Sequence, residues 1–170
     1  MGKPVIDIDL RVESNNWPDS ESMAEMASRA LQAAAAFLSE ETAQPFGDPV
    51  CEVSVLLTDD AAMQILNRTW RKLDKPTNVL SFPTADLAPG DRPGLSLGDI
   101  VLARETVCRQ AAELGKPLEH HVSHLMVHGF LHLLGYDHEN AQNAELMERF
   151  EARILARLGL SNPYLDHDPV

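Results

Sequence analysis

Four segments of the chain have the hydrophobic pattern of β-strands. Residues 5–12 alternate apolar and polar side chains, which is the two-residue period of a strand with one buried face. A stretch near position 100 is an apolar run interrupted by Gly98 and Asp99, which is typical of a buried strand. The predicted strands are 5–12, 51–58, 79–83 and 97–103.

Five further segments have the composition or the spacing of α-helices. Residues 22–41 are rich in Ala, Met, Leu and Glu, with apolar positions three and four apart. Asp19 or Ser20 is placed to cap this helix, and Thr58 or Asp59 to cap the next. The predicted helices are 22–41, 61–70, 104–114 (ended by Gly115), a histidine-bearing helix that Pro117 opens in its first turn, and 141–158.

The order of these elements predicts an α+β fold. Strands and helices are intermixed without an internal repeat, so we expect one domain over 1–170, with a small mixed sheet of about four strands packed with about five helices. The histidine-bearing helix is apolar around most of its circumference, so it should be central and buried. Residues 84–93 are rich in Pro and Gly and predict a loop, and 161–170 predict a loose tail.

The overall charge argues against a broad nucleic-acid-binding surface. The 170 residues carry a net charge of −12, although a local basic patch remains compatible with that sum because screening limits the reach of exposed charges to about 8–10 Å. Four of the 14 basic residues fall within 68–75. They are Arg68, Arg71, Lys72 and Lys75. This segment is either a solvated helix end, with cations at the negative end of the helix dipole, or an anion-binding patch beside a metal.

Nothing in the sequence indicates a membrane or an oxidising compartment. There is no N-terminal signal pattern and no apolar run of about 18 residues, so we expect a cytoplasmic protein without a membrane partner. Cys51 and Cys108 do not form a disulfide framework and are read as reduced, small buried side chains.

The strongest chemical signal lies at residues 128–138. His128 and His132 are four apart on a helix, which puts both imidazoles on one face, about 5–6 Å apart at Cβ. Gly135 can end the helix in a left-handed turn that brings His138 to the same point. Three imidazoles and an open fourth position describe a catalytic zinc site, although nickel or copper could also be bound.

His124 is the competing ligand, because it shares the helical face of His128 and His132. Three histidines at successive steps of four on a straight helix span about 12 Å and cannot all reach one ion, so His138 is the better third ligand. Asp99 could orient a metal-binding imidazole from behind, and a structural hydrogen bond to a neighbouring loop is an equal alternative. His120 and His121 are expected to be exposed near the helix start.

The spacing His-x-x-x-His-x-x-Gly-x-x-His is that of the metzincin zinc proteases, with one decisive difference. A metalloprotease has its general-base glutamate directly after the first histidine, where this chain has Gly129. The pattern therefore predicts metal binding but not peptide hydrolysis.

Three stretches together resemble the YbeY family of bacterial endoribonucleases and ribosomal RNA maturation factors. They are HGFLHLLGYDH at 128–138, DKPTNVLSFP at 74–83 and LGDI at 97–100. The resemblance implies zinc-dependent cleavage of single-stranded RNA, with one Zn²⁺ held by His128, His132 and His138. It also implies small-subunit ribosomal RNA 3′-end processing and ribosome quality control, in contact with the small ribosomal subunit and its proteins. By matching position, the family's functional arginine is Arg71.

Elementary chemistry agrees with that implication. A zinc ion with an open position lowers the pKa of a bound water and polarises a phosphoryl oxygen, and Arg71 can bind a phosphate through two hydrogen bonds. Arg68, Lys72 and Lys75 would add salt-sensitive affinity for the RNA backbone. The general base stays open between an activated water and the RNA 2′-hydroxyl. Two alternatives are a non-catalytic zinc-containing ribosome-assembly factor and a hydrolase of another substrate.

Overall fold

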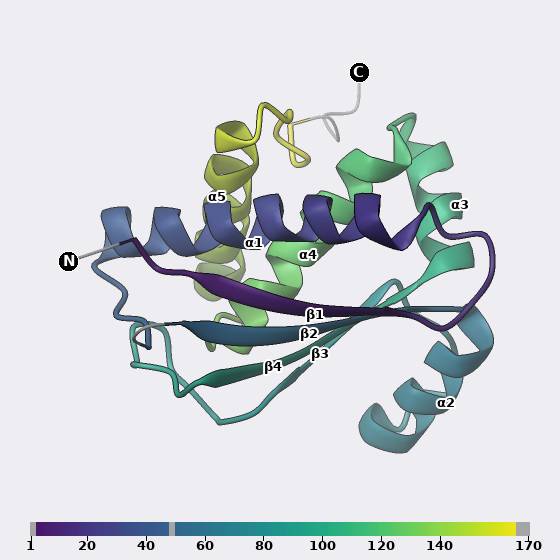
Figure 1. Ribbon diagram of the computed structural model, residues 1–170, viewed down its shortest axis with the longest axis horizontal. Helices are drawn as coiled ribbons and strands as arrows, with labels where there is room; N and C mark the ends of the chain where they lie inside the picture. The colour runs from purple at the N-terminus through teal and green to yellow at the C-terminus, as the bar shows by residue number, and fades with distance from the viewer. Residues whose placement is uncertain (1–2, 48–49, 166–170) are drawn as a thin grey trace.

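The four predicted strands form one mixed sheet in the computed structural model, which describes residues 3–47 and 50–165 (Figure 1). The strands are β1 (Ile6–Val12), β2 (Cys51–Thr58), β3 (Val79–Pro83) and β4 (Ser96–Ala103). Their order is β1-β2-β4-β3; β1, β2 and β4 run parallel, and β3 pairs antiparallel with β4 at the edge. The predicted α+β class is confirmed.

The five predicted helices are present in the described residues with small shifts at their ends. They are α1 (Ser20–Thr42), α2 (Asp60–Arg71), α3 (Arg104–Leu114), α4 (Leu118–Leu133) and α5 (Ala141–Arg157). The caps are now decided: Asp19 accepts from the Ser22 amide at 3.0 Å, and Asp59 accepts from the Ala62 amide at 2.9 Å. Pro117 is the N-cap residue of α4, directly before its first turn, and does not lie within that turn.

The helices divide unequally between the two faces of the sheet. Figure 1 shows α1 and α4 on one face, with α3 and α5 against them, and α2 on the opposite side. The alternation of β2 explains this division, because Cys51, Val53, Val55 and Leu57 are all buried towards the main core. A second, smaller core lies with α2, and its buried members are Met63, Leu80, Val101 and Ala103.

The helix α4 is the centre of the main core, as its composition predicts. It contacts α1, α3 and α5 as well as β3 and β4. Its buried residues include Val122, Met126, Phe130 and Leu133. In the described part of the chain, none of the helices has the length and apolarity needed to cross a membrane.

The prediction of a loose tail is wrong for the part that the structure describes. Pro163 is buried, and the ring of Tyr164 lies edge-on to His124 with centroids 5.7 Å apart. Residues 166–170, which include His167, lie outside the described residues.

Candidate metal centre

The helix α4 places His128 and His132 on one face, as the spacing of four residues requires. Their Nε2 atoms are 3.1 Å apart. Since two ring nitrogens at this distance face each other from successive turns, both can direct a lone pair at the same point.

A tight turn after α4 brings the third histidine to that point. The Gly135 amide donates to the His132 carbonyl and the Tyr136 amide to the Leu131 carbonyl, each at 3.0 Å. This pair of bonds is a Schellman motif, which needs a residue with positive φ at the glycine position. Gly135 has φ +100°, and a Cβ there would lie 2.2 Å from the Leu87 carbonyl oxygen. Glycine is therefore required twice over, by the backbone conformation and by the close approach of the 84–93 loop.

The turn completes a cluster of three imidazoles whose chemistry fits a metal ion. The centroid of the His138 ring lies 5.0 Å from that of His132 and 5.6 Å from that of His128. One nitrogen of each histidine lies within 4.8 Å of the others. Burial, with the neighbouring His128 and His138, lowers the pKa of His132 to about 4, so this ring is neutral and available as a donor near pH 7. The structure thus brings together the three predicted ligands.

The competing ligand His124 is engaged elsewhere. Its Nε2 lies 2.6 Å from Oε1 of Glu151, and His124 is not part of the three-histidine group. His124 therefore lies apart from the other three histidines, as expected for three histidines on one straight helix.

Glu151 is the residue of the site that the sequence analysis missed. It lies on α5, is only 1% exposed, and accepts a hydrogen bond from Nδ1 of His128 at 2.8 Å. Burial raises the pKa of this carboxyl, but the hydrogen bonds from His124 and His128 outweigh burial and hold the pKa at about 2. A signal was available: Glu151 falls on the buried stripe of α5, between Met147 and Ile154.

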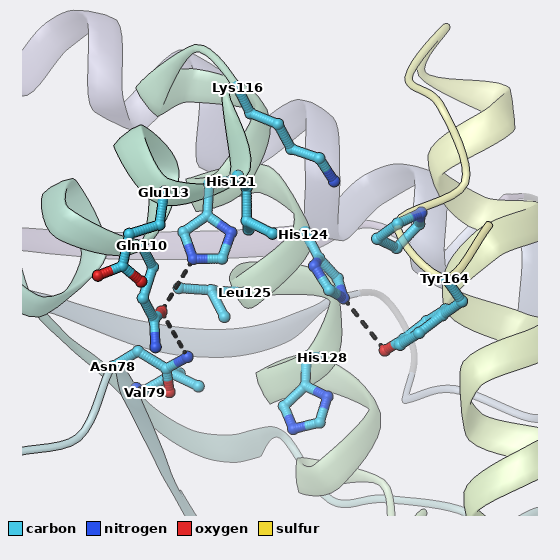
Figure 2. Close-up of a pocket in the computed structure, with 12 residues that line it drawn as sticks. Asn78, Val79, Gln110, Glu113, Lys116, His121, His124, Leu125, His128 and Tyr164 are labelled. Carbon is cyan, nitrogen blue, oxygen red and sulfur yellow. Dashed lines mark hydrogen bonds between the residues drawn. The ribbon is translucent and has the colours of Figure 1, made fainter. Parts of the chain in front are cut away.

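An open cavity of about 390 Å³ adjoins the cluster on one side. Figure 2 shows His121, His124 and His128 projecting from α4 along this cavity, with Tyr164 opposite His124. The remaining lining residues are Asn78, Val79, Gln110, Glu113, Leu114, Lys116, Leu125 and Pro163. The cavity therefore has both apolar and polar side chains in its wall, beside a predicted metal ligand.

The prediction that His121 is exposed is wrong. His121 lies in the first turn of α4, and its side chain is buried. Its Nε2 lies 3.0 Å from Oε1 of Gln110, and the same oxygen accepts a hydrogen bond from Nδ2 of Asn78 at 2.9 Å. Burial lowers the pKa of His121 to about 4. His120, one residue earlier, is exposed as expected.

Gly129 lies where α4 packs closely against the sheet. A Cβ there would lie 3.0 Å from Cγ2 of Ile100 and 3.0 Å from Oγ of Ser81. The Ser81 hydroxyl also donates to the Gly129 carbonyl at 3.2 Å. The position that carries the general base in a metzincin therefore faces packed strands, with no space for a glutamate.

The basic segment is exposed, and none of its four cations lines the cavity beside His128. Arg71 is the last residue of α2, and Lys72 caps that helix with φ +60°. Arg68 lies 3.6 Å from Asp74 across an exposed pair. The first residue of this region that reaches the cavity is Asn78. The approach of Arg71 to the metal centre stays a prediction.

Asp99 does not support an imidazole. Its neighbour Ile100 packs against Gly129, so the alternation of β4 directs Asp99 to the opposite face, where it is exposed. There it lines a second cavity of about 610 Å³ together with Trp70 and Phe82. Of the two alternatives that the sequence left open for Asp99, the orientation of a metal ligand is therefore excluded.

Comparison with known proteins places the chain among sequences of one kind. The family described as endoribonuclease YbeY matches residues 9–159. A protein named endoribonuclease YbeY from Sinorhizobium medicae is 53% identical over 165 residues, which is 97% of this chain and 98% of that protein. One of the same name from Rhizobium johnstonii is 53% identical over 163 residues, covering 96% and 95% of the two chains. The solution structure of TM1509 from Thermotoga maritima superimposes with a TM-score of 0.53 at 25% identity, covering 97% of this chain and 98% of that one.

Proposed function

Because the chain belongs to the YbeY family, it is an endoribonuclease, and we propose that it cleaves single-stranded RNA with one zinc ion held by His128, His132 and His138. The observation that carries this proposal is the convergence of three imidazole nitrogens within 4.8 Å of one another, beside an open cavity that His128 lines. Three neutral nitrogen donors from the protein, with one side open, are the donor set of catalytic zinc sites.

The ion, when bound, supplies an activated water and polarises a phosphoryl oxygen. The chain's own residues position the substrate around it. His128 would be both a ligand and part of the cavity wall, so a nucleotide that enters the cavity would contact a residue that holds the ion. Gly129, whose position is filled by Ile100 and Ser81, removes the general base of a peptidase and favours a phosphodiester substrate.

We assign the phosphate contacts to the end of α2 and the loop after it. Arg71 would bind a phosphate through two hydrogen bonds and stabilise the negative charge of the transition state. Arg68, Lys72 and Lys75 are exposed on the same segment and would bind neighbouring phosphates. The segment leads through Asn78 into the cavity wall, which supports a path for the RNA strand from the basic segment to the metal centre.

The biological role that follows is ribosomal RNA maturation. We propose that the protein acts in the cytoplasm, as a single domain over 1–170, on the 3′ end of small-subunit ribosomal RNA and in ribosome quality control, in contact with the small subunit and its proteins. The net charge of −12 restricts RNA contacts to the local basic segment, since an acidic surface repels the phosphate backbone elsewhere.

One set of variants tests the proposal. Wild type, His132→Ala, Arg71→Glu and the control Arg29→Glu would be incubated with a defined single-stranded RNA and its duplex, with bound metal measured in parallel. Arg29 is exposed on α1, which contributes nothing to the cavity wall, so its reversal matches the charge change at a distance from the site.

We expect wild type and Arg29→Glu to bind zinc and cut the single strand preferentially. His132→Ala should lose both metal and cleavage, and Arg71→Glu should keep the metal and lose cleavage. Full cleavage by metal-free His132→Ala would refute the metal-dependent mechanism. Homogeneous wild type that associates with small subunits but leaves every RNA intact would instead favour the non-catalytic assembly factor.

A further inference from the structure

A buried network behind the metal centre connects α4, α5 and the segment after α5. At its centre is the carboxylate of Glu151, which accepts from His128 through Oε2 and from His124 and Tyr164 through Oε1. The carboxylate is 1% exposed. Burying a charged carboxylate is costly unless its oxygens are hydrogen-bonded, so a group kept in this position by three donors needs a physical explanation.

The two nitrogens of His128 show what that explanation is. Nδ1 lies 2.8 Å from the carboxylate, and Nε2 lies 3.1 Å from Nε2 of His132. An ionised carboxylate carries no hydrogen and can only accept, so Nδ1 of His128 carries the hydrogen. Nε2 then keeps its lone pair, and that lone pair points at the position where the three histidines converge.

We propose that Glu151 is the positioning residue of the metal centre. It fixes His128 in the Nδ1–H tautomer, locks the orientation of the ring and increases the donor strength of Nε2 towards the ion. His124 and Tyr164 do not bind the ion; they hold the carboxylate in place. This inference rests on the proposed function, because it takes the three-histidine cluster to be the metal site.

The network also gives a function to the segment after α5. The hydroxyl of Tyr164 donates to Oε1 of Glu151, and its ring lies against His124 with centroids 5.7 Å apart. Tyr164, which is also part of the cavity wall, therefore supplies one of the hydrogen bonds that hold the carboxylate in place.

The test replaces Glu151→Gln in the full chain, which keeps the size of the side chain and removes its charge. Glu145→Gln is the matched control, because Glu145 is an exposed glutamate of the same helix. Zinc affinity would be measured by competition with a chromophoric chelator. The imidazole nitrogens of the zinc-loaded proteins would be observed by long-range ¹⁵N–¹H correlation, which reports each histidine separately.

We expect Glu151→Gln to bind zinc about 10–100-fold more weakly and to change the Nδ1–H signal of His128 while those of His132 and His138 stay in place. Glu145→Gln should match wild type in both measurements. Should Glu151→Gln fail to fold, Tyr164→Phe removes only the hydroxyl; it should weaken zinc binding measurably but by less than tenfold, and change the Nδ1–H signal of His128 while those of His132 and His138 stay in place.

Unchanged zinc affinity and an unchanged His128 signal in folded Glu151→Gln would overturn the inference, and so would an equal loss in Glu145→Gln. The proposed function would survive that result if wild type still bound zinc and cleaved RNA. A wild-type protein that binds no zinc would overturn both.

Discussion

Replacing Gly135 with alanine should destabilise the turn that brings His138 to the metal centre. Alanine at φ +100° is in a strained backbone conformation, which costs about 1–3 kcal/mol. The added Cβ would also lie 2.2 Å from the Leu87 carbonyl oxygen, and overpacking of this kind costs about a further 1–3 kcal/mol. The free energy of unfolding should therefore fall by about 2–6 kcal/mol.

A matched control separates the two contributions. Gly90 has a similar φ of +93°, and no atom of the described residues lies within 4 Å of a Cβ built there. Gly90→Ala should therefore show only the backbone strain of about 1–3 kcal/mol. The difference between the two variants isolates the clash with the 84–93 loop.

Urea denaturation of both variants gives the two free energies, and chelator competition gives the zinc affinity. Gly135→Ala should be the less stable variant and should bind zinc more weakly, because the loop and the turn must move apart and His138 moves with the turn. If the two variants unfolded within about 0.5 kcal/mol of each other and bound zinc equally, the steric argument for this glycine would be wrong.

Three further predictions concern the packing of Gly129, the burial of His121 and the binding of zinc. Gly129→Ala should lower the free energy of unfolding by about 1–3 kcal/mol in urea, since its Cβ would meet Ile100 and Ser81 at 3.0 Å; a fully stable Gly129→Glu protein would contradict this. Burial lowers the pKa of His121 to about 4 from 6.5. Between these two pH values the unfolded chain binds a proton at His121 that the folded chain does not bind. The free energy of unfolding should therefore fall by up to about 3 kcal/mol as the pH drops through that window. Denaturation of His121→Gln at a series of pH values should show a flatter dependence, and equal slopes would refute the assignment. Removing zinc with a chelator should lower the free energy of unfolding by about 4 kcal/mol relative to protein with free zinc at 1,000 times Kd, and identical melting curves would argue against the site.

Local spacing was enough to place the strands and helices, although it left the caps of α1 and α2 open and put Pro117 inside α4 instead of before it. Strand alternation, helical periodicity and capping side chains act within a few residues, so the nine elements could be placed to within a few residues at each end. The pair His128 and His132 is equally local, because four residues make about one helical turn. Gly135 added the direction of the turn, and its close approach to Leu87 shows why no other residue would serve.

Position across the sheet and across the core was decided only by the tertiary structure. The sequence left Asp99 open between the support of an imidazole and a structural hydrogen bond. The fold excludes the first, because its neighbour Ile100 is the residue that packs on α4, and strand alternation sends Asp99 to the other face. His121 was read as exposed, but Gln110 of α3 covers it.

The supporting carboxylate was missed for the same reason. Glu151 is 23 residues from His128 and acts only because α5 packs against α4. The sequence by itself determined that the imidazoles of His128, His132 and His138 lie close together, since one helix and the turn after it fix their spacing. The packing of helices that are distant along the chain decided which hydrogen bonds hold those imidazoles, because a buried charge is stable only where the fold brings donors to it.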